Sequence, residues 1–171
     1  MKLAALNAAS RESARSALTA CCGSHRWVDR MIERRPFASP EALFAAADDI
    51  WSSLGREDWL EAFAHHPRIG ESKAAVAQDS RARGWSAAEQ GDSSRGDTAV
   101  RAEQQRLNAE YEQRFGYIYI VCATGKSPTE MVSIARRRLA NTPDQELGVA
   151  AEEQRKITRL RLEKLLNDSS S

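Results

Sequence analysis

The sequence has no long apolar run and no excess of charge of one sign, and these two absences exclude several classes of protein. Its 171 residues include 25 Lys or Arg and 24 Asp or Glu, which gives a formal net charge of +1. A membrane-spanning helix needs about 20 consecutive apolar residues, and a nucleic-acid or membrane surface needs clustered positive charge. We therefore expect no nucleic-acid and no membrane partner. A small molecule or a second copy of the chain is the expected partner.

Cysteine is also scarce. The three cysteines are Cys21, Cys22 and Cys122, and the adjacent two would rarely pair with each other. This pattern is typical of a reducing compartment. Asn7 and the polar residues 10–12 interrupt the N-terminal apolar residues, which argues against a signal peptide. We expect a cytoplasmic protein, and the chain length predicts a single domain over residues 1–171.

Most of the sequence has the three-to-four-residue periodicity of helices rather than the alternation of strands. Ser39 and Pro40 are typical of a helix start, and one apolar stripe follows them, formed by Leu43, Ala47, Ile50 and Leu54. Residues 127–130 form a capping box, in which a serine and a glutamate bond each other's backbone amides. Residues 142–143 begin a long C-terminal helix that should end near Leu166. We expect an all-α, single-domain bundle of about eight helices.

Two segments depart from this pattern. Residues 71–84 are polar and bounded by glycines, and we expect a mobile excursion there. Tyr117–Ala123 is instead apolar and rich in β-branched residues, but no second strand is available to pair with it. We therefore expect one short, buried, extended or irregular segment whose backbone groups need other partners, and a polar ligand is one candidate. Residues 167–171 should form a frayed tail.

The stretch Phe63–Glu71 contains the first candidate for chemistry. A helix should end at His65, and Pro67 restricts the residue before it, His66, to extended backbone. An imidazole fixed in this way suits proton transfer near neutral pH. The structural alternative is that His66 only caps the carbonyl groups of the helix end.

Two further positions have both a structural and a functional interpretation. Ser86 and Glu89 are candidates for a second capping box, and the helix N-terminus that it would start could also bind an anionic or ureide-like ligand with Gln90. In the last helix, Arg161 falls on the apolar stripe with Ala150, Gln154, Ile157 and Leu165. A buried guanidinium needs an anionic partner, which is either an internal carboxylate or a substrate carboxylate.

Other constellations are weaker. His65, His66 and Glu71 do not have the spacing of a metal site, because adjacent histidines point apart, and we expect no metal. Gly125-Lys126-Ser127 resembles the end of a phosphate loop, but Ile120 stands where the required glycine should be. No nucleotide site is therefore expected.

Several separated stretches together resemble one family. They are residues 27–37, residues 59–71, Ser86 to Gln90, Tyr119 to Ala123 and residues 156–162. The family is 2-oxo-4-hydroxy-4-carboxy-5-ureidoimidazoline (OHCU) decarboxylase, which makes (S)-allantoin at the end of urate oxidation. The resemblance implies an all-helical homodimer without a metal or an organic cofactor.

The same resemblance implies roles for particular residues. His66, Glu89 and Arg161 correspond to the catalytic residues, with His66 as the proton donor. The implied substrate-binding residues are Pro67, Ser86, Ala87, Ala88, Glu89, Gln90, Tyr119, Ile120, Val121, Cys122 and Ala123. The expected activity is that of a carboxy-lyase acting on OHCU as its small-molecule substrate. Two alternatives stay open: a non-catalytic helical module that binds a ureide or carboxylate ligand, and a ureide hydrolase in which His66 is the general base.

Overall fold

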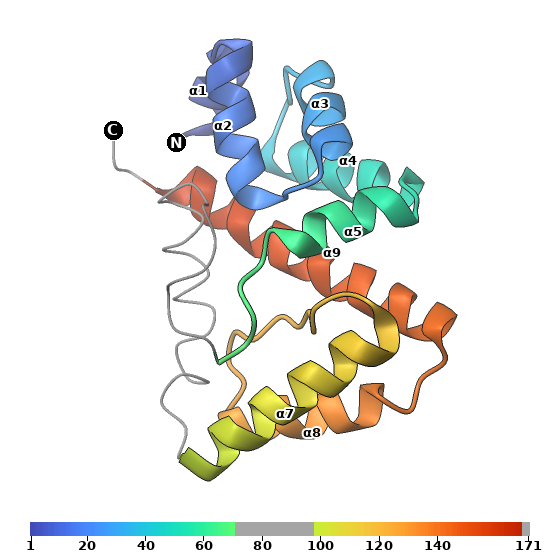
Figure 1. The fold of residues 1–171 in the computed structure, drawn as a ribbon. Helices are drawn as coiled ribbons and strands as arrows, with labels where there is room; N and C mark the ends of the chain where they lie inside the picture. Colours follow the sequence, from blue (N-terminus) through green and yellow to red (C-terminus); the bar gives the residue numbers. More distant parts are fainter. Residues whose placement is uncertain (71–97, 169–171) are drawn as a thin grey trace. The chain divides into compact units, whose positions relative to one another are not determined.

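The computed structural model describes residues 1–70 and 98–168, and these ranges form eight helices and no strand. The helices are α1 (Leu3–Ala8), α2 (Arg11–Cys21), α3 (His25–Glu33), α4 (Pro40–Ser53), α5 (Arg56–Ala64), α7 (Thr98–Phe115), α8 (Pro128–Arg138) and α9 (Pro143–Asn167). Figure 1 shows their order along the chain. The all-α prediction is confirmed. The predicted excursion at residues 71–84 lies outside the described residues, and α9 reaches one residue beyond Leu166.

The helix starts follow the local signals in the sequence. The Ser39 hydroxyl accepts a hydrogen bond from the Ala42 amide at 3.1 Å, and Pro40 is the first residue of α4. The Ser127 hydroxyl accepts one from the Glu130 amide at 3.1 Å in the same way. These bonds satisfy amide groups that a helix N-terminus leaves without an intrahelical partner. The predicted starts of α4 and α8 are therefore confirmed.

The contacts between residues divide the described chain into two compact units. Residues 1–62 and 155–168 form the first unit, and residues 63–70 and 98–154 form the second. The boundary falls inside α5 after Ala62 and inside α9 after Gln154. The single domain over residues 1–171 stays a prediction.

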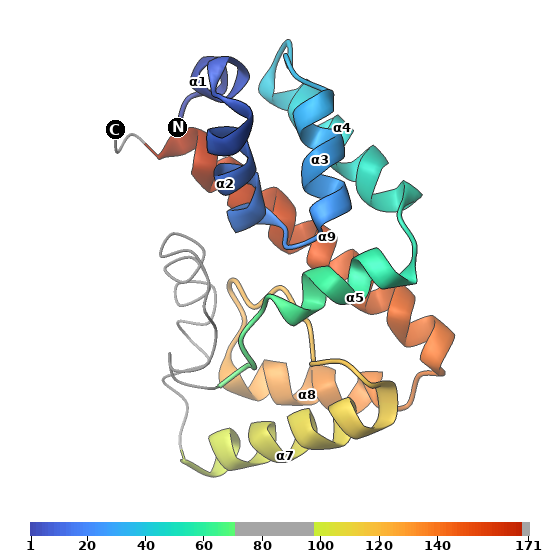
Figure 2. The same cartoon turned by 45° about the horizontal axis from the view of Figure 1, so that its top comes forward.

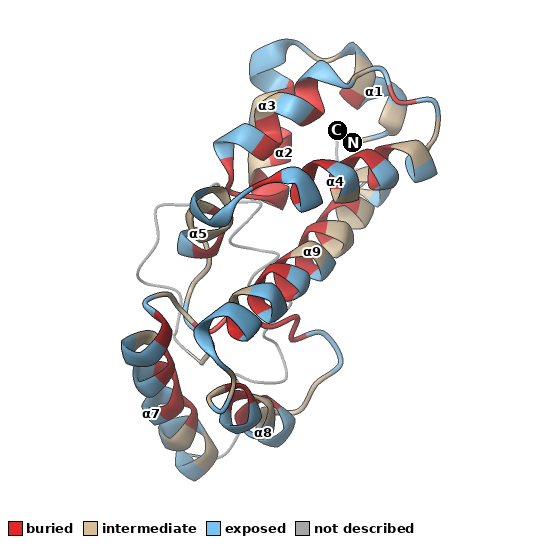
Figure 3. Cartoon of the chain, turned by 90° about the vertical axis from the view of Figure 1, so that its right-hand side faces the viewer, coloured by how far each residue is buried: buried red, intermediate tan, exposed pale blue. Residues whose placement is uncertain are grey.

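The first unit contains α1–α4, most of α5 and the end of α9. Its core includes Leu6, Leu18, Trp27 and Leu43, all of which are fully buried. The Trp27 indole Nε1 donates to the Ala47 carbonyl at 3.2 Å, so the largest side chain of this core is also hydrogen-bonded. Figure 3 shows buried residues on one side of α4 and exposed residues on the other. This division is the one that the apolar stripe of α4 predicts.

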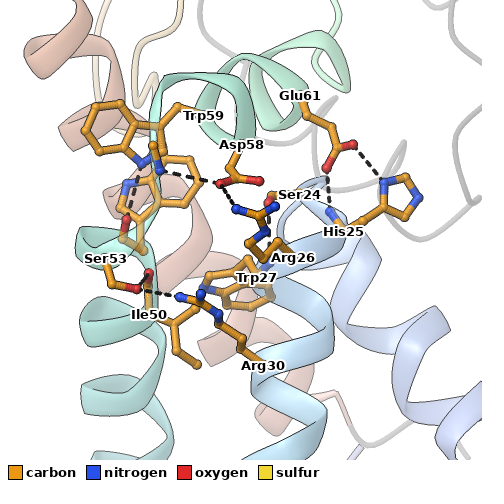
Figure 4. A network of polar contacts seen from close by, with 12 residues as sticks. Ser24, His25, Arg26, Trp27, Arg30, Ile50, Ser53, Asp58, Trp59 and Glu61 are labelled. Atoms are coloured by element: carbon orange, nitrogen blue, oxygen red, sulfur yellow. Dashed lines mark hydrogen bonds and ion pairs between the residues drawn. The ribbon is translucent and has the colours of Figure 1, made fainter.

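Polar contacts connect α5 to α3 and α4 within this unit (Figure 4). Glu61 accepts hydrogen bonds from the His25 amide at 2.5 Å and from His25 Nδ1 at 2.9 Å. The Trp59 indole donates to the Trp51 carbonyl at 3.2 Å, and Arg30 donates to the Ser53 hydroxyl at 2.9 Å. His25 is thus an exposed residue at a helix start.

The second unit is built around α7, α8 and the segment between them, and the two helices run side by side in Figures 1 and 2. The buried residues of α7 lie on one face at helical spacing: Gln104, Leu107, Asn108, Tyr111 and Phe115. The Tyr111 ring packs 4.7 Å from the Phe115 ring and 5.5 Å from the Tyr119 ring. Tyr111 is fully buried and therefore lies within the aromatic core of this unit.

The segment Tyr117–Ala123 is neither helix nor strand, and Tyr119–Ala123 is buried throughout. Its carbonyl groups find partners outside any sheet. Arg138 Nη1 donates to the Ile120 carbonyl at 2.6 Å, and Lys126 Nζ donates to the Cys122 carbonyl at 2.6 Å. The prediction of a short buried irregular segment is confirmed. Two of the partners that its backbone requires are side chains of the protein, Arg138 and Lys126.

Candidate active site

His66 lies just after α5, in the second unit. Its amide donates to the Phe63 carbonyl at 3.1 Å, and Pro67 follows it, so the backbone on both sides of the ring is restricted. The residue is half-buried. Its ring Nε2 lies 2.6 Å from Oε1 of Gln154 in α9. The side chain is therefore held by its own backbone and by a second helix of the same unit.

Gln154 determines which ring nitrogen of His66 carries a proton. It is fully buried, and its amide oxygen can only accept a hydrogen bond. A contact between this oxygen and Nε2 therefore requires a proton on Nε2. The sequence pattern placed Gln154 on the apolar stripe of the last helix but gave it no function. A glutamine among apolar residues was the available signal, because a buried amide needs a partner.

A buried hydrogen-bond network around Arg138 fixes the Tyr119–Ala123 segment, because Arg138 Nη1 donates to the Ile120 carbonyl. Arg138 Nε donates to Glu146 Oε1 at 2.6 Å, and the Tyr111 hydroxyl donates to the same carboxylate oxygen at 2.6 Å. Glu146 is fully buried and Arg138 is 6% exposed. Burial raises the pKa of Tyr111 well above its ordinary value, and its hydrogen bond to Glu146 acts in the same direction. The phenol therefore stays a neutral donor, and Arg138 balances the charge of Glu146.

The first unit contains Arg161, which is 4% exposed although it is charged. The prediction that Arg161 points to the apolar side of the last helix is confirmed, and Arg159 on the neighbouring stripe is half-exposed. Beside Arg161 lies Cys22, whose thiol has its pKa raised to about 11 by burial. Hydrogen bonds from the Ser24 backbone and the Thr158 side chain, and the charge of Arg161, oppose that rise without cancelling it.

The structure places the predicted site residues in three groups. His66, Pro67 and the run Tyr119–Ala123 belong to the second unit, whereas Arg161 belongs to the first. Ser86, Ala87, Ala88, Glu89 and Gln90 lie outside the described residues. Their roles stay predictions.

Residues 1–70 and 98–168 contain neither a metal-binding cluster nor a membrane-spanning helix. No group of three or more His, Cys, Asp or Glu side chains in these ranges could hold a metal ion. No described helix is both long enough and apolar enough to span a bilayer. Cys21, Cys22 and Cys122 are all buried, and none of them forms a disulfide bond.

Comparison with known proteins agrees with this fold. The family model for OHCU decarboxylase matches residues 7–163. The chain is 38% identical over 152 residues to the uric acid degradation bifunctional protein TTL of Arabidopsis thaliana, covering 88% of the chain but only 46% of that protein. It is 31% identical over 142 residues to 2-oxo-4-hydroxy-4-carboxy-5-ureidoimidazoline decarboxylase of Amia calva, covering 77% of the chain and 75% of that protein.

A solved structure gives the same result. The crystal structure of an OHCU decarboxylase in the presence of (S)-allantoin superposes with a TM-score of 0.77 at 32% identity, covering 90% of this chain and 99% of that one. The fold and the candidate site thus define an all-helical protein with a histidine immediately before a proline. The chain belongs to the OHCU decarboxylase family.

Proposed function

We propose that this chain removes the carboxyl group of OHCU and releases (S)-allantoin, the last step of urate oxidation. The family match over residues 7–163 carries this proposal. The similar crystal structure, which was obtained in the presence of (S)-allantoin, supports a small-molecule ligand of this kind. A homodimer and a cytoplasmic location are parts of the proposal that rest on the family resemblance and on the cysteine pattern.

The substrate provides its own electron sink. Its C4 atom carries the carboxylate and a hydroxyl group, and C5 carries the ureido group and forms a C=N bond in the ring. When the bond from C4 to the carboxylate breaks, its electron pair forms a C4=C5 double bond, and the C=N pair moves to nitrogen, which takes up a proton. Protonation of C5 and loss of the hydroxyl proton then give the C4 carbonyl of allantoin. One proton is consumed overall, and one carbon dioxide leaves.

The side chain that protonates C5 determines the handedness of the product. We assign this step to His66, because its backbone is fixed by Pro67 and its ring is oriented by Gln154. With Nε2–H donating to Gln154, we assign the proton exchange with the substrate to Nδ1, and the imidazolium is the donor form. A positioned acid of this kind contributes roughly 10²- to 10⁴-fold in rate.

The other predicted residues complete the proposed site. The buried guanidinium of Arg161 would orient an anionic group of the substrate or the Glu89 carboxylate. Glu89 would polarise the hydroxyl or ureido side, and Gln90 would bind the ureide. The buried backbone of Tyr119–Ala123 would line the pocket. All of these are roles that mutation can test one by one.

The reaction products separate the proposed activity from the two alternatives. Hydrolysis and decarboxylation differ in their products. Freshly generated OHCU should release carbon dioxide and keep its urea nitrogen. Free urea or ammonia would instead show hydrolysis, and no acceleration over the spontaneous reaction would support the binding module.

A further inference from the structure

Helix α7 carries a row of three polar side chains, two of which contact the segment after His66. The α7 polar row consists of Gln104, Asn108 and Glu112, spaced four residues apart and therefore on one face. Asn108 Nδ2 donates to the Ile69 carbonyl at 2.8 Å. Glu112 Oε1 accepts from Arg68 Nε at 2.6 Å. All of these groups belong to the second unit, as does His66.

Asn108 and Glu112 differ in how well their bonds to this segment are shielded from water. Asn108 is 5% exposed and Ile69 is 6% exposed, so their hydrogen bond is shielded from water. The side chains of Arg68 and Glu112 are 46% and 26% exposed, and solvent screens their ion pair. A buried carbonyl that lost its donor would carry the full cost of desolvation. Asn108 therefore restrains the segment more strongly than Glu112 does.

Gln104 determines the orientation of Asn108. Its Nε2 donates to Asn108 Oδ1 at 2.8 Å, which leaves the Asn108 amino group to face the Ile69 carbonyl. Gln104 is itself 5% exposed, and its Oε1 is buried without a hydrogen bond. The hydrogen bond that the Gln104 side chain contributes here is therefore the one from its Nε2 to Asn108.

The segment between these bonds is short. The His66 amide is bonded to the Phe63 carbonyl, and the Ile69 carbonyl is bonded to Asn108 only three residues further on. Pro67 fixes one backbone angle between the two points. Gly70, with a φ of +83°, then turns the chain through a conformation that other residues rarely adopt. The segment that carries His66 is thus restrained at its start by the bond to the end of α5. At Ile69 it is restrained by the buried bond to Asn108.

We propose that Asn108, oriented by Gln104, is a positioning residue for His66. The inference rests on the proposed function, in which His66 donates the proton to one face of the substrate. Asn108 touches no reacting atom. It acts by holding the Ile69 carbonyl, and hence the segment that starts at His66, in one place.

The test is Asn108→Asp, which keeps the size of the side chain and the acceptor for Gln104 but presents an oxygen to the Ile69 carbonyl. We expect kcat to fall about tenfold to a hundredfold with little change in KM, because a misplaced acid affects the transition state more than binding. The enantiomeric excess of allantoin, measured by circular dichroism, should fall as well. Gln104→Leu should show the same effects more weakly.

Two control variants separate positioning from general stability. Glu112→Gln removes the exposed ion pair to the same segment and should leave kcat unchanged. Val132→Ala opens a gap in the buried core on α8 and should lower Tm without lowering kcat of the folded enzyme. An Asn108→Asp variant with kcat within about twofold of wild type, and with a loss of Tm like that of Val132→Ala, would overturn the proposal.

A readout that needs no substrate keeps this proposal distinct from the proposed function. The chain has only three histidines, so the ring nitrogens of His66 can be identified by NMR through comparison with His66→Gln. Asn108→Asp should shift or broaden the His66 signals and leave those of His25 unchanged. Unchanged His66 signals would contradict the positioning role. A wild-type protein without enantioselective turnover would contradict the proposed function instead.

Discussion

Gln154 places its amide oxygen 2.6 Å from Nε2 of His66, across 88 residues of sequence. The contact joins a fully buried side chain of α9 to the half-buried ring that follows α5. A neutral acceptor orients the imidazole without adding a negative charge beside it. A carboxylate in the same place would instead favour the protonated form of the ring.

Gln154→Glu should shift the pH dependence of turnover. A carboxylate at this distance favours the imidazolium, so the pH limb of kcat/KM that reports His66 should move to higher pH by about 1 to 3 units. Gln154→Leu should instead lower kcat without that shift, because it removes the acceptor and adds no charge. The measurement is the pH profile of both variants and wild type. Identical profiles for Gln154→Glu and wild type would show that this contact does not govern the proton donor.

Glu146→Ala should destabilise the second unit strongly. It leaves the Arg138 guanidinium buried without its carboxylate, and removing one partner of a buried pair costs about 3 to 5 kcal/mol. Glu103 provides the matched control, because its carboxylate accepts from Arg106 and Arg136 at an exposed site. Glu103→Ala should cost far less, because solvent screens an exposed ion pair. Urea unfolding of the two variants measures the difference, and equal losses would mean that the buried network is not the main restraint on residues 119–123.

Cys22 should make the stability of the protein depend on alkaline pH. Its pKa is raised from 9.0 to about 11 by burial, so between these values the folded protein keeps a thiol proton that the unfolded chain has lost. The stabilising contribution is complete below pH 9 and is lost as the pH rises towards 11, by an amount on the order of 2 kcal/mol. Cys22→Ala lacks this contribution.

The comparison of wild type with Cys22→Ala isolates that group from the tyrosines, which titrate in both proteins. Urea unfolding at several pH values between 8 and 11 should give two curves of unfolding free energy that converge as the pH rises. Curves that stay parallel would show that the Cys22 thiol ionises as readily in the folded protein as in the unfolded chain.

Much of the fold could be predicted because its signals are local. Ser39 with Pro40, and Ser127 with Pro128, mark helix starts through atoms three residues away, and the structure contains these bonds. The burial of Arg161 followed from its place on an apolar stripe of a single helix. The helix ends were less certain, since α5 ends at Ala64 rather than at His65.

The contacts that orient the candidate site could not be predicted in this way. The bonds from Arg138 to Ile120 and from Asn108 to Ile69 join residues 18 and 39 positions apart, and nothing in the local pattern names either partner. The sequence did indicate that the Tyr117–Ala123 backbone needs partners. It could not show that two of these are Arg138 and Lys126, because any cation or a ligand would satisfy a carbonyl equally well.

The adjacent histidines provide the most direct test of the proton donor. The substrate also decays spontaneously to racemic allantoin, so handedness rather than disappearance must be measured. Circular dichroism should follow the product of freshly generated OHCU with wild type, His65→Ala and His66→Ala. We predict (S)-allantoin from wild type and His65→Ala, and racemic product at the spontaneous rate from a folded His66→Ala variant. Undiminished (S)-allantoin from His66→Ala would contradict the assignment of His66 as the proton donor.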